Sequence, residues 1–196
     1  MEFFFLQPSA TIAALEAYCR NAIAEKAAGI IVPPLMVKKA KEFLDGAAVN
    51  IAVPVGYPYG WNAVEAKLSE VILAMVDGAD ELDFYINLTA LKNHDWQYLA
   101  KELTMAMTVI RKQQKKINIV FDAALLTDDE LTKCCDLYGV AGADSLTVST
   151  GLNEVAPEPV LQLLRQQLAN AIPLRAIAIE NNNLPAVIAR PVRIVK

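Results

Sequence analysis

The chain alternates between short β-type runs and segments of helical pattern along its whole length. Eight such runs can be distinguished, and they cover residues 2–6, 29–32, 49–53, 81–87, 117–122, 145–149, 174–178 and 192–195. Repeated strand–helix–strand units form parallel sheets with right-handed crossovers. The order therefore predicts an α/β protein, either an open doubly wound sheet or a closed (β/α)8 TIM barrel, and eight strands of similar length favour the barrel.

The length of the chain predicts a shortened form of this barrel. Its 196 residues suit one domain over residues 1–196, whereas a barrel of this kind has about 250 residues and a lower limit near 200. The segment between the seventh and eighth runs is brief, so we expect the shortening at the C-terminal end.

Local signals predict where several helices begin and end. Ser9 is expected to start the first helix and Asn62 to cap the third, which Gly78 would end. Thr127 and Glu130 have the spacing of a capping box, in which each side chain bonds the other residue's backbone N–H.

Composition and charge exclude several classes of partner. The net charge is −4 and the sequence pI is about 5.1, which argues against nucleic acid. The longest apolar run, residues 71–76, is far too short to cross a bilayer, and the acidic start does not suit a secretory signal. We therefore expect a cytoplasmic protein without a membrane partner.

No cofactor or metal is predicted. Cys19, Cys134 and Cys135 have neither disulfide-framework nor metal-ligand spacing, which suits a reducing compartment. The single histidine, His94, lies in a predicted loop without a second ligand nearby, and we expect it at the surface or at a helix start.

Polar side chains alternate with apolar ones in three consecutive strands. Asp83, Tyr85 and Asn87 share one face of the fourth run, Asn118 and Asp122 one face of the fifth, and Ser145, Thr147 and Ser149 one face of the sixth. Arg175 is the lone charge in the seventh run. If this face is the lumen, the charges lie inside together with the hydroxyls.

Two interpretations of this polar face stay open. Buried charges must be paired or hydrated, so an internal pair of Arg175 with a carboxylate and satisfied hydroxyls could simply fill the barrel. Alternatively, the polar groups line a wet pocket at the carboxyl ends of the strands, where barrel enzymes place their sites.

At this point the chain resembles the deoxyribose-phosphate aldolase family along nearly its whole length. The segment KLSEVILAMVDGADELDFYIN is similar to the family's Lys-x-x-Glu … Gly-Ala-Asp-Glu-Ile-Asp-x-x-Ile-Asn block, and GADSLTVSTG to Gly-Ala-Asp-Phe-x-Lys-Thr-Ser-Thr-Gly. FFFLQPSAT, IIVPPLMV, VPVGYPYG and LLTDDE resemble further family segments. The resemblance implies a (β/α)8 barrel and an oligomer of identical chains.

The resemblance also implies a reaction. Family members use a lysine to form an imine with acetaldehyde, which adds to glyceraldehyde 3-phosphate. That lysine corresponds to Thr147, and a second lysine that lowers its pKa corresponds to Arg175. Asp83 matches the proton-relay aspartate and Asp122 the acid of the fifth strand. Asn87, Asn118, Ser149, Thr150 and Gly151 are expected to bind the ligand.

The substitutions argue against the family's reaction. Threonine has no nitrogen with which to form an imine, and arginine stays protonated. Gly151 retains part of the phosphate site, but Glu180 stands in the family's second phosphate loop and would repel the group. The third phosphate region is expected to be absent. At the first strand, Glu2-Phe3-Phe4 replaces Asp-His-Thr.

No other lysine is an obvious replacement. Lys67 is expected on a helix, facing solvent or an acid such as Glu70, and Lys196 at the rim of the barrel as a solvated terminal residue. Whether the protein is an enzyme therefore stays open. We weigh three functions: a degenerate barrel that binds a small ligand or a partner, a lyase or isomerase that uses Asp83, Asp122 and Arg175, and a structural subunit of a homo-oligomer. A residual aldolase with a relocated lysine, such as Lys196, is a further alternative.

Overall fold

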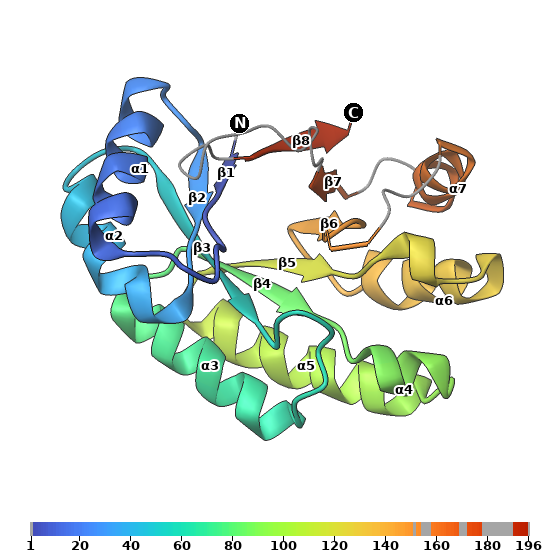
Figure 1. Cartoon of the computed structure of the whole chain (residues 1–196). Helices are drawn as coiled ribbons and strands as arrows, with labels where there is room; N and C mark the ends of the chain where they lie inside the picture. Colours follow the sequence, from blue (N-terminus) through green and yellow to red (C-terminus); the bar gives the residue numbers. More distant parts are fainter. Residues whose placement is uncertain (1, 151, 154–157, 169–171, 178–189, 196) are drawn as a thin grey trace.

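Seven parallel strands curl around a common axis, and an eighth strand closes the ring (Figure 1). The computed structural model describes residues 2–150, 152–153, 158–168, 172–177 and 190–195. The parallel strands are β1 (Glu2–Phe4), β2 (Gly29–Ile31), β3 (Asn50–Val55), β4 (Glu81–Tyr85), β5 (Lys116–Val120), β6 (Ser145–Thr147) and β7 (Leu174–Ile177). Each pairs with its neighbour in chain order, as the alternating sequence pattern predicts.

The eighth strand runs in the opposite direction from the one expected. β8 (Arg190–Val195) pairs antiparallel with both β7 and β1, so the prediction of eight parallel strands is wrong at this position. A parallel neighbour requires a crossover of a dozen or more residues, usually through a helix, whereas an antiparallel neighbour does not. The connection between β7 and β8, residues 178–189, has twelve residues, the lower limit for such a crossover, and lies outside the described residues.

Helices cover the outside of the curled sheet (Figure 1). They are α1 (Ile12–Ala24), α2 (Val37–Leu44), α3 (Val64–Asp77), α4 (Leu88–Lys92), α5 (Trp96–Lys112), α6 (Asp128–Gly139) and α7 (Glu158–Leu168), with short 3-10 turns η1 (Pro34–Met36) and η2 (Ala123–Leu125). The main hydrophobic core lies between these helices and the outward strand residues, for example Leu82, Phe84 and Leu146. Burial of this apolar layer is the largest stabilising contribution to such a fold.

Helix ends confirm two of the sequence predictions and correct two. Thr127 and Glu130 form the expected capping box at the start of α6, and Gly78 ends α3 in the left-handed conformation with φ of 112°. α1 is capped by Thr11 instead of Ser9. Asn62 lies one residue too early to cap α3 and instead donates to the Glu70 carboxylate at 2.8 Å.

The inside of the sheet is divided into an apolar and a polar half. Ile31 and Ala52 form a small separate cluster with Phe4 and Leu6, contributed by β1 to β3 and the residues just after β1. The inward positions of β4 to β7 carry polar residues, and these alternate along each strand with the apolar residues that face the outer core. A polar site is therefore built by one half of the ring.

Candidate functional site

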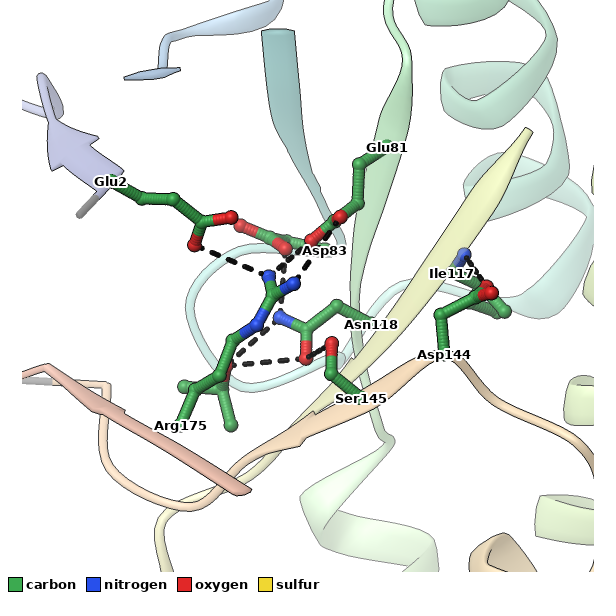
Figure 2. A network of polar contacts seen from close by, with 9 residues as sticks. Glu2, Glu81, Asp83, Ile117, Asn118, Asp144, Ser145 and Arg175 are labelled. Atoms are coloured by element: carbon green, nitrogen blue, oxygen red, sulfur yellow. Dashed lines mark hydrogen bonds and ion pairs between the residues drawn. The ribbon is translucent and has the colours of Figure 1, made fainter. Parts of the chain in front are cut away.

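A chain of hydrogen bonds joins the inward residues of β4, β5 and β6 (Figure 2). The Asn118 side-chain amide donates to Asp83 Oδ1 at 2.8 Å and to Thr147 Oγ1 at 2.9 Å. Its oxygen accepts from Ser145 Oγ at 2.9 Å. All four residues are buried. These hydrogen bonds join three of the predicted site residues, Asp83, Asn118 and Thr147, in one network.

Arg175 binds two carboxylates that the sequence analysis did not select. Its guanidinium donates to both Glu81 oxygens and lies 3.3 Å from Glu2 Oε2. Figure 2 shows Glu2 from β1 and Glu81 from β4 approaching the guanidinium from two sides. The alternation could have identified Glu81, because it lies two residues before Asp83 and must share its face. Glu2 becomes a partner only when the ring brings β1 near β7.

Burial changes the protonation of Asp83. Desolvation and the nearby Glu81 raise the pKa of Asp83 to about 8, although Asn118 and Arg175 act in the opposite direction. Burial also raises the pKa of Glu2, against the attraction of Arg175. At neutral pH, Asp83 therefore retains a proton that it can donate to a neighbouring oxygen.

Asp122 takes part in a separate cluster after the ends of β5 and β6. It accepts from Thr150 N at 2.5 Å, from Thr150 Oγ1 at 2.6 Å and from Asn153 Nδ2 at 2.6 Å. The structure thus brings Asp122 and Thr150 together but does not join them to the Asp83 network by a hydrogen bond among the described residues. Gly151, the remaining predicted residue of this loop, lies outside the described residues.

The two other predicted ligand-binding residues, Asn87 and Ser149, differ in whether the protein already provides their side chains with a hydrogen-bond partner. Asn87 caps α4 by accepting from Ala90 N at 3.0 Å, so its oxygen has a structural partner. Ser149 follows β6 with the inward parity of Thr147 and is 1% exposed, and within the described part of the chain its Oγ has no hydrogen-bond partner. Ser149 is therefore the hydroxyl that remains free for a ligand.

A cavity opens at the carboxyl ends of β1 to β3. Its volume is about 390 Å³, and it is lined by Leu6, Gln7, Pro8, Pro33, Pro34, Pro54, Tyr57 and Glu70. The Tyr57 ring packs edge-on against the Tyr85 ring at a centroid distance of 5.4 Å. Since Tyr85 has the inward parity of Asp83 on β4, this contact places the cavity next to the polar half of the ring.

Of the two predicted environments for Lys67, solvent or an acid such as Glu70, the structure shows an acid, but this acid is Glu102 and the side chain is buried. It is fully buried, and its Nζ donates to the Tyr85 carbonyl at 2.7 Å and to Glu102 Oε1 at 2.7 Å. It also lies 4.8 Å from the centre of the Phe84 ring, an outer-core residue, and so belongs to the layer outside the sheet. Lys67 is the only buried lysine among residues whose burial is described, and Lys196 lies outside them.

The described residues offer neither a metal-binding cluster nor a membrane-spanning helix. No cluster of three or more histidine, cysteine, aspartate or glutamate side chains there has an arrangement that could hold a metal ion. None of the described helices has the length and apolarity needed to traverse a bilayer.

Comparison with known proteins identifies the family. No model of a protein family matches the chain. The deoxyribose-phosphate aldolase of Clostridium perfringens strain 13 is 31% identical over 172 residues, which cover 87% of this chain and 76% of that protein. The chain belongs to the deoxyribose-phosphate aldolase family. The Thermococcus kodakarensis member is 36% identical over 148 residues, covering 74% of this chain and 66% of the relative.

Solved structures of the family have the same fold. A deoxyribose-phosphate aldolase from Coccidioides immitis, described as putative, superimposes with a TM-score of 0.82 at 25% identity and covers 89% of this chain and 69% of its own. The tetrameric aldolase of Aeropyrum pernix gives a TM-score of 0.80 at 21% identity and covers 89% and 74%.

Proposed function

We propose that this chain is one domain over residues 1–196, a shortened relative of the (β/α)8 barrel with seven parallel strands and an antiparallel eighth. We propose further that it binds a small molecule at the carboxyl ends of the parallel strands and does not form an imine on β6. The observation that carries the proposal is the side chain at position 147. Thr147 stands at the family's lysine position, and its hydroxyl is hydrogen-bonded to Asn118.

The chemistry of these side chains supports the loss of the imine. An imine requires a primary amine that loses its proton, attacks a carbonyl and expels water. Thr147 supplies no nitrogen, and the guanidinium of Arg175 is held as a cation by Glu81 and Glu2. Lys67 is fully buried, and its Nζ is engaged by the Tyr85 carbonyl and by Glu102.

Binding at the strand ends is supported by the cavity and by Ser149. Barrel enzymes place their sites at this end, and a volume of about 390 Å³ suits a small molecule. The unpartnered hydroxyl of Ser149 follows β6 at this end of the ring, and the Asp122 and Thr150 cluster borders the same end.

Borohydride trapping tests the missing imine. The wild-type protein is incubated with acetaldehyde and reduced, and peptides are mapped by mass spectrometry. We expect only slow, scattered modification of exposed lysines. The Thr147→Lys/Arg175→Lys variant, whose folding is checked by circular dichroism, should gain a prominent adduct at position 147. A stoichiometric wild-type adduct at one lysine would contradict the proposal.

A second function, proton exchange as in a lyase or isomerase, is favoured by Asp83 alone. Its pKa of about 8 allows it to give and take protons near neutral pH. Asp122 supports this function less well, because its oxygens accept from Thr150 and Asn153. We expect hydroxy-ketones incubated with the wild-type protein in D2O to exchange their α-hydrogens for deuterium, and the Asp83→Asn substitution to abolish this exchange. Equal exchange in both proteins would remove this alternative.

We further propose a homo-oligomer in the reducing cytoplasm. The related aldolase of Aeropyrum pernix is a tetramer, and the outer face of α3 carries Ile72, Leu73 and Val76 with 47%, 63% and 75% exposure. The three cysteines are free and buried, as a reducing compartment allows. Light scattering that gave a monomer mass would oppose the oligomer.

A further inference from the structure

The apolar half of the ring continues into the cavity at the ends of β1 to β3. Ile31 and Ala52 are buried inside this half, and Phe4 and Leu6 pack against them. Leu6 also lines the cavity, so the two share a side chain. A ligand in the cavity therefore contacts hydrocarbon on the side that leads toward the inside of the ring.

Most of the remaining cavity wall consists of rigid rings. Besides Leu6, the apolar lining comprises four prolines and one aromatic residue: Pro8, Pro33, Pro34, Pro54 and Tyr57. A proline side chain has no rotamer freedom to lose when a ligand binds. The Tyr57 ring packs edge-on against the Tyr85 ring at a centroid distance of 5.4 Å. The wall is thus formed before binding, which lowers the entropic cost of association.

The cavity provides few hydrogen bonds for a ligand. Glu70 lines it, but its oxygens accept from Gly56 N at 2.7 Å and from Asn62 Nδ2 at 2.8 Å. Both partners belong to the segment that carries Tyr57, so Glu70 holds this wall in place. Gln7 and the Tyr57 phenol supply the other polar groups. Each further ligand hydroxyl placed against proline rings would lose its bonds to water without replacement.

We propose that this cavity binds an uncharged molecule with one aromatic ring and one hydroxyl or carbonyl group, the class represented by benzyl alcohol. The ring packs against the prolines, Leu6 and Tyr57, and the polar group bonds to Gln7 or to the Tyr57 phenol. An apolar cavity of about 150 Å³ already accepts benzene. The volume of about 390 Å³ therefore leaves room for a ring with a short side chain.

This inference rests on the proposed function, because it names the class of ligand for the same end of the barrel. Ligand-observed NMR with a graded series tests it. Saturation-transfer titrations give dissociation constants for benzyl alcohol, 2-phenylethanol and 3-phenylpropan-1-ol, with ribose as the polyhydroxylated comparison. Each added methylene should tighten binding about two- to fourfold through the apolar area that it buries. Ribose should bind at least about tenfold more weakly than 2-phenylethanol.

Two substitutions in the segment between β3 and α3 locate the ligand. Tyr57→Ala removes a lining ring and should weaken the binding of 2-phenylethanol at least about fivefold. Trp61→Ala removes an exposed ring that is not part of the lining, and it should leave the affinity unchanged. Circular dichroism checks that both variants fold. Nuclear Overhauser effects between the ligand ring and the Leu6 methyl groups locate the ligand in the wild-type protein without any substitution.

The possible failures can be told apart. If ribose binds as well as 2-phenylethanol, or if the phenyl series shows no tightening, the inferred ligand class is wrong while small-molecule binding stands. Equal losses in the two variants, or no contact with Leu6, would place the ligand elsewhere and overturn the inference. If none of these compounds binds, the inference also fails. The absence of binding by any small hydroxy- or oxo-compound in a thermal-shift screen would overturn the proposed binding function itself.

Discussion

At the scale of single residues, the buried pair of Lys67 and Glu102 is the most demanding feature of the molecule. Their side chains are 0% and 1% exposed, and the Nζ to Oε1 distance is 2.7 Å. Burial lowers the pKa of Lys67 and raises the pKa of Glu102, while their mutual attraction opposes both shifts. Each charge is therefore stable in the core only because the other is present.

Removing the charge of Lys67 should be strongly destabilising. Lys67→Met leaves the Glu102 carboxylate buried and the Tyr85 carbonyl without its donor, and we expect a loss of about 3–5 kcal/mol in the free energy of unfolding. Urea denaturation measures this loss. Lys39→Met, which removes the exposed pair with Glu42, should cost at most about 1 kcal/mol. Similar losses in the two variants would show that the Lys67 pair is not structurally important.

At the scale of elements, the segment between β3 and α3 shapes the cavity by packing against the end of β4. Gly60 N donates to Gly56 O at 2.7 Å, and Leu88 N donates to Tyr59 O at 3.1 Å. Gly60 has φ of +65°, and a Cβ at this position would lie 2.1 Å from the Ile86 carbonyl oxygen. Glycine is required here both by its dihedral angle and by the close approach of the two backbones.

Two glycine substitutions separate these requirements. Gly46 has φ of +73°, and a Cβ there would meet nothing within 4 Å. Gly46→Ala should cost about 1–2 kcal/mol through the left-handed conformation alone. Gly60→Ala should cost roughly 1–3 kcal/mol more, because the backbone of β4 or of the preceding segment must shift. Thermal or urea unfolding compares the two, and equal losses would contradict the packing argument.

At the scale of the whole molecule, Arg175 connects strands that lie far apart in the chain. It joins β7 to Glu2 of β1 and to Glu81 of β4 across the inside of the ring. Glu2, Glu81 and Asp83 lie around one guanidinium, and burial together with Glu81 raises the pKa of Asp83 to about 8 against the attraction of that guanidinium. Neutralising the carboxylates in this way stabilises a closed ring whose first and last strands meet.

Arg175→Met should destabilise the fold in a pH-dependent manner. Arg175 lowers the pKa of both Glu2 and Asp83, so its loss raises these values further and favours their protonated forms in the folded state. We expect a loss of about 3–5 kcal/mol at pH 7 that becomes smaller near pH 4. Glu2, whose pKa is raised by burial, takes up a proton over this range, whereas Asp83 already retains its proton at pH 7. Urea denaturation at the two pH values measures the loss. Arg20→Met, from an exposed pair with Glu16, provides the control and should change little at either pH. A loss for Arg175→Met that does not depend on pH would contradict the electrostatic origin.

The sequence by itself determined the local features of this protein. The spacing of the apolar runs predicted the order of the strands, because period-two and helical patterns are properties of neighbouring residues. The same alternation placed Asp83, Asn118 and Thr147 on one face, and Thr127 and Gly78 marked helix ends through their own side-chain and backbone chemistry. The absence of an amine from the side chain at position 147 is likewise visible without a structure.

Only the tertiary structure decided which of these groups meet. The direction of β8, the burial of Lys67 against Glu102, and the pairing of Arg175 with Glu2 and Glu81 all depend on how distant strands close into a ring. Asp122 shares the parity of Asn118 but lies after the end of its strand, and it therefore binds Thr150 instead of the Asp83 network. The physical reason is that the face to which a side chain points alternates locally along its strand. The depth of that side chain along the barrel, and its partners across the barrel, depend instead on the register between strands far apart in the sequence.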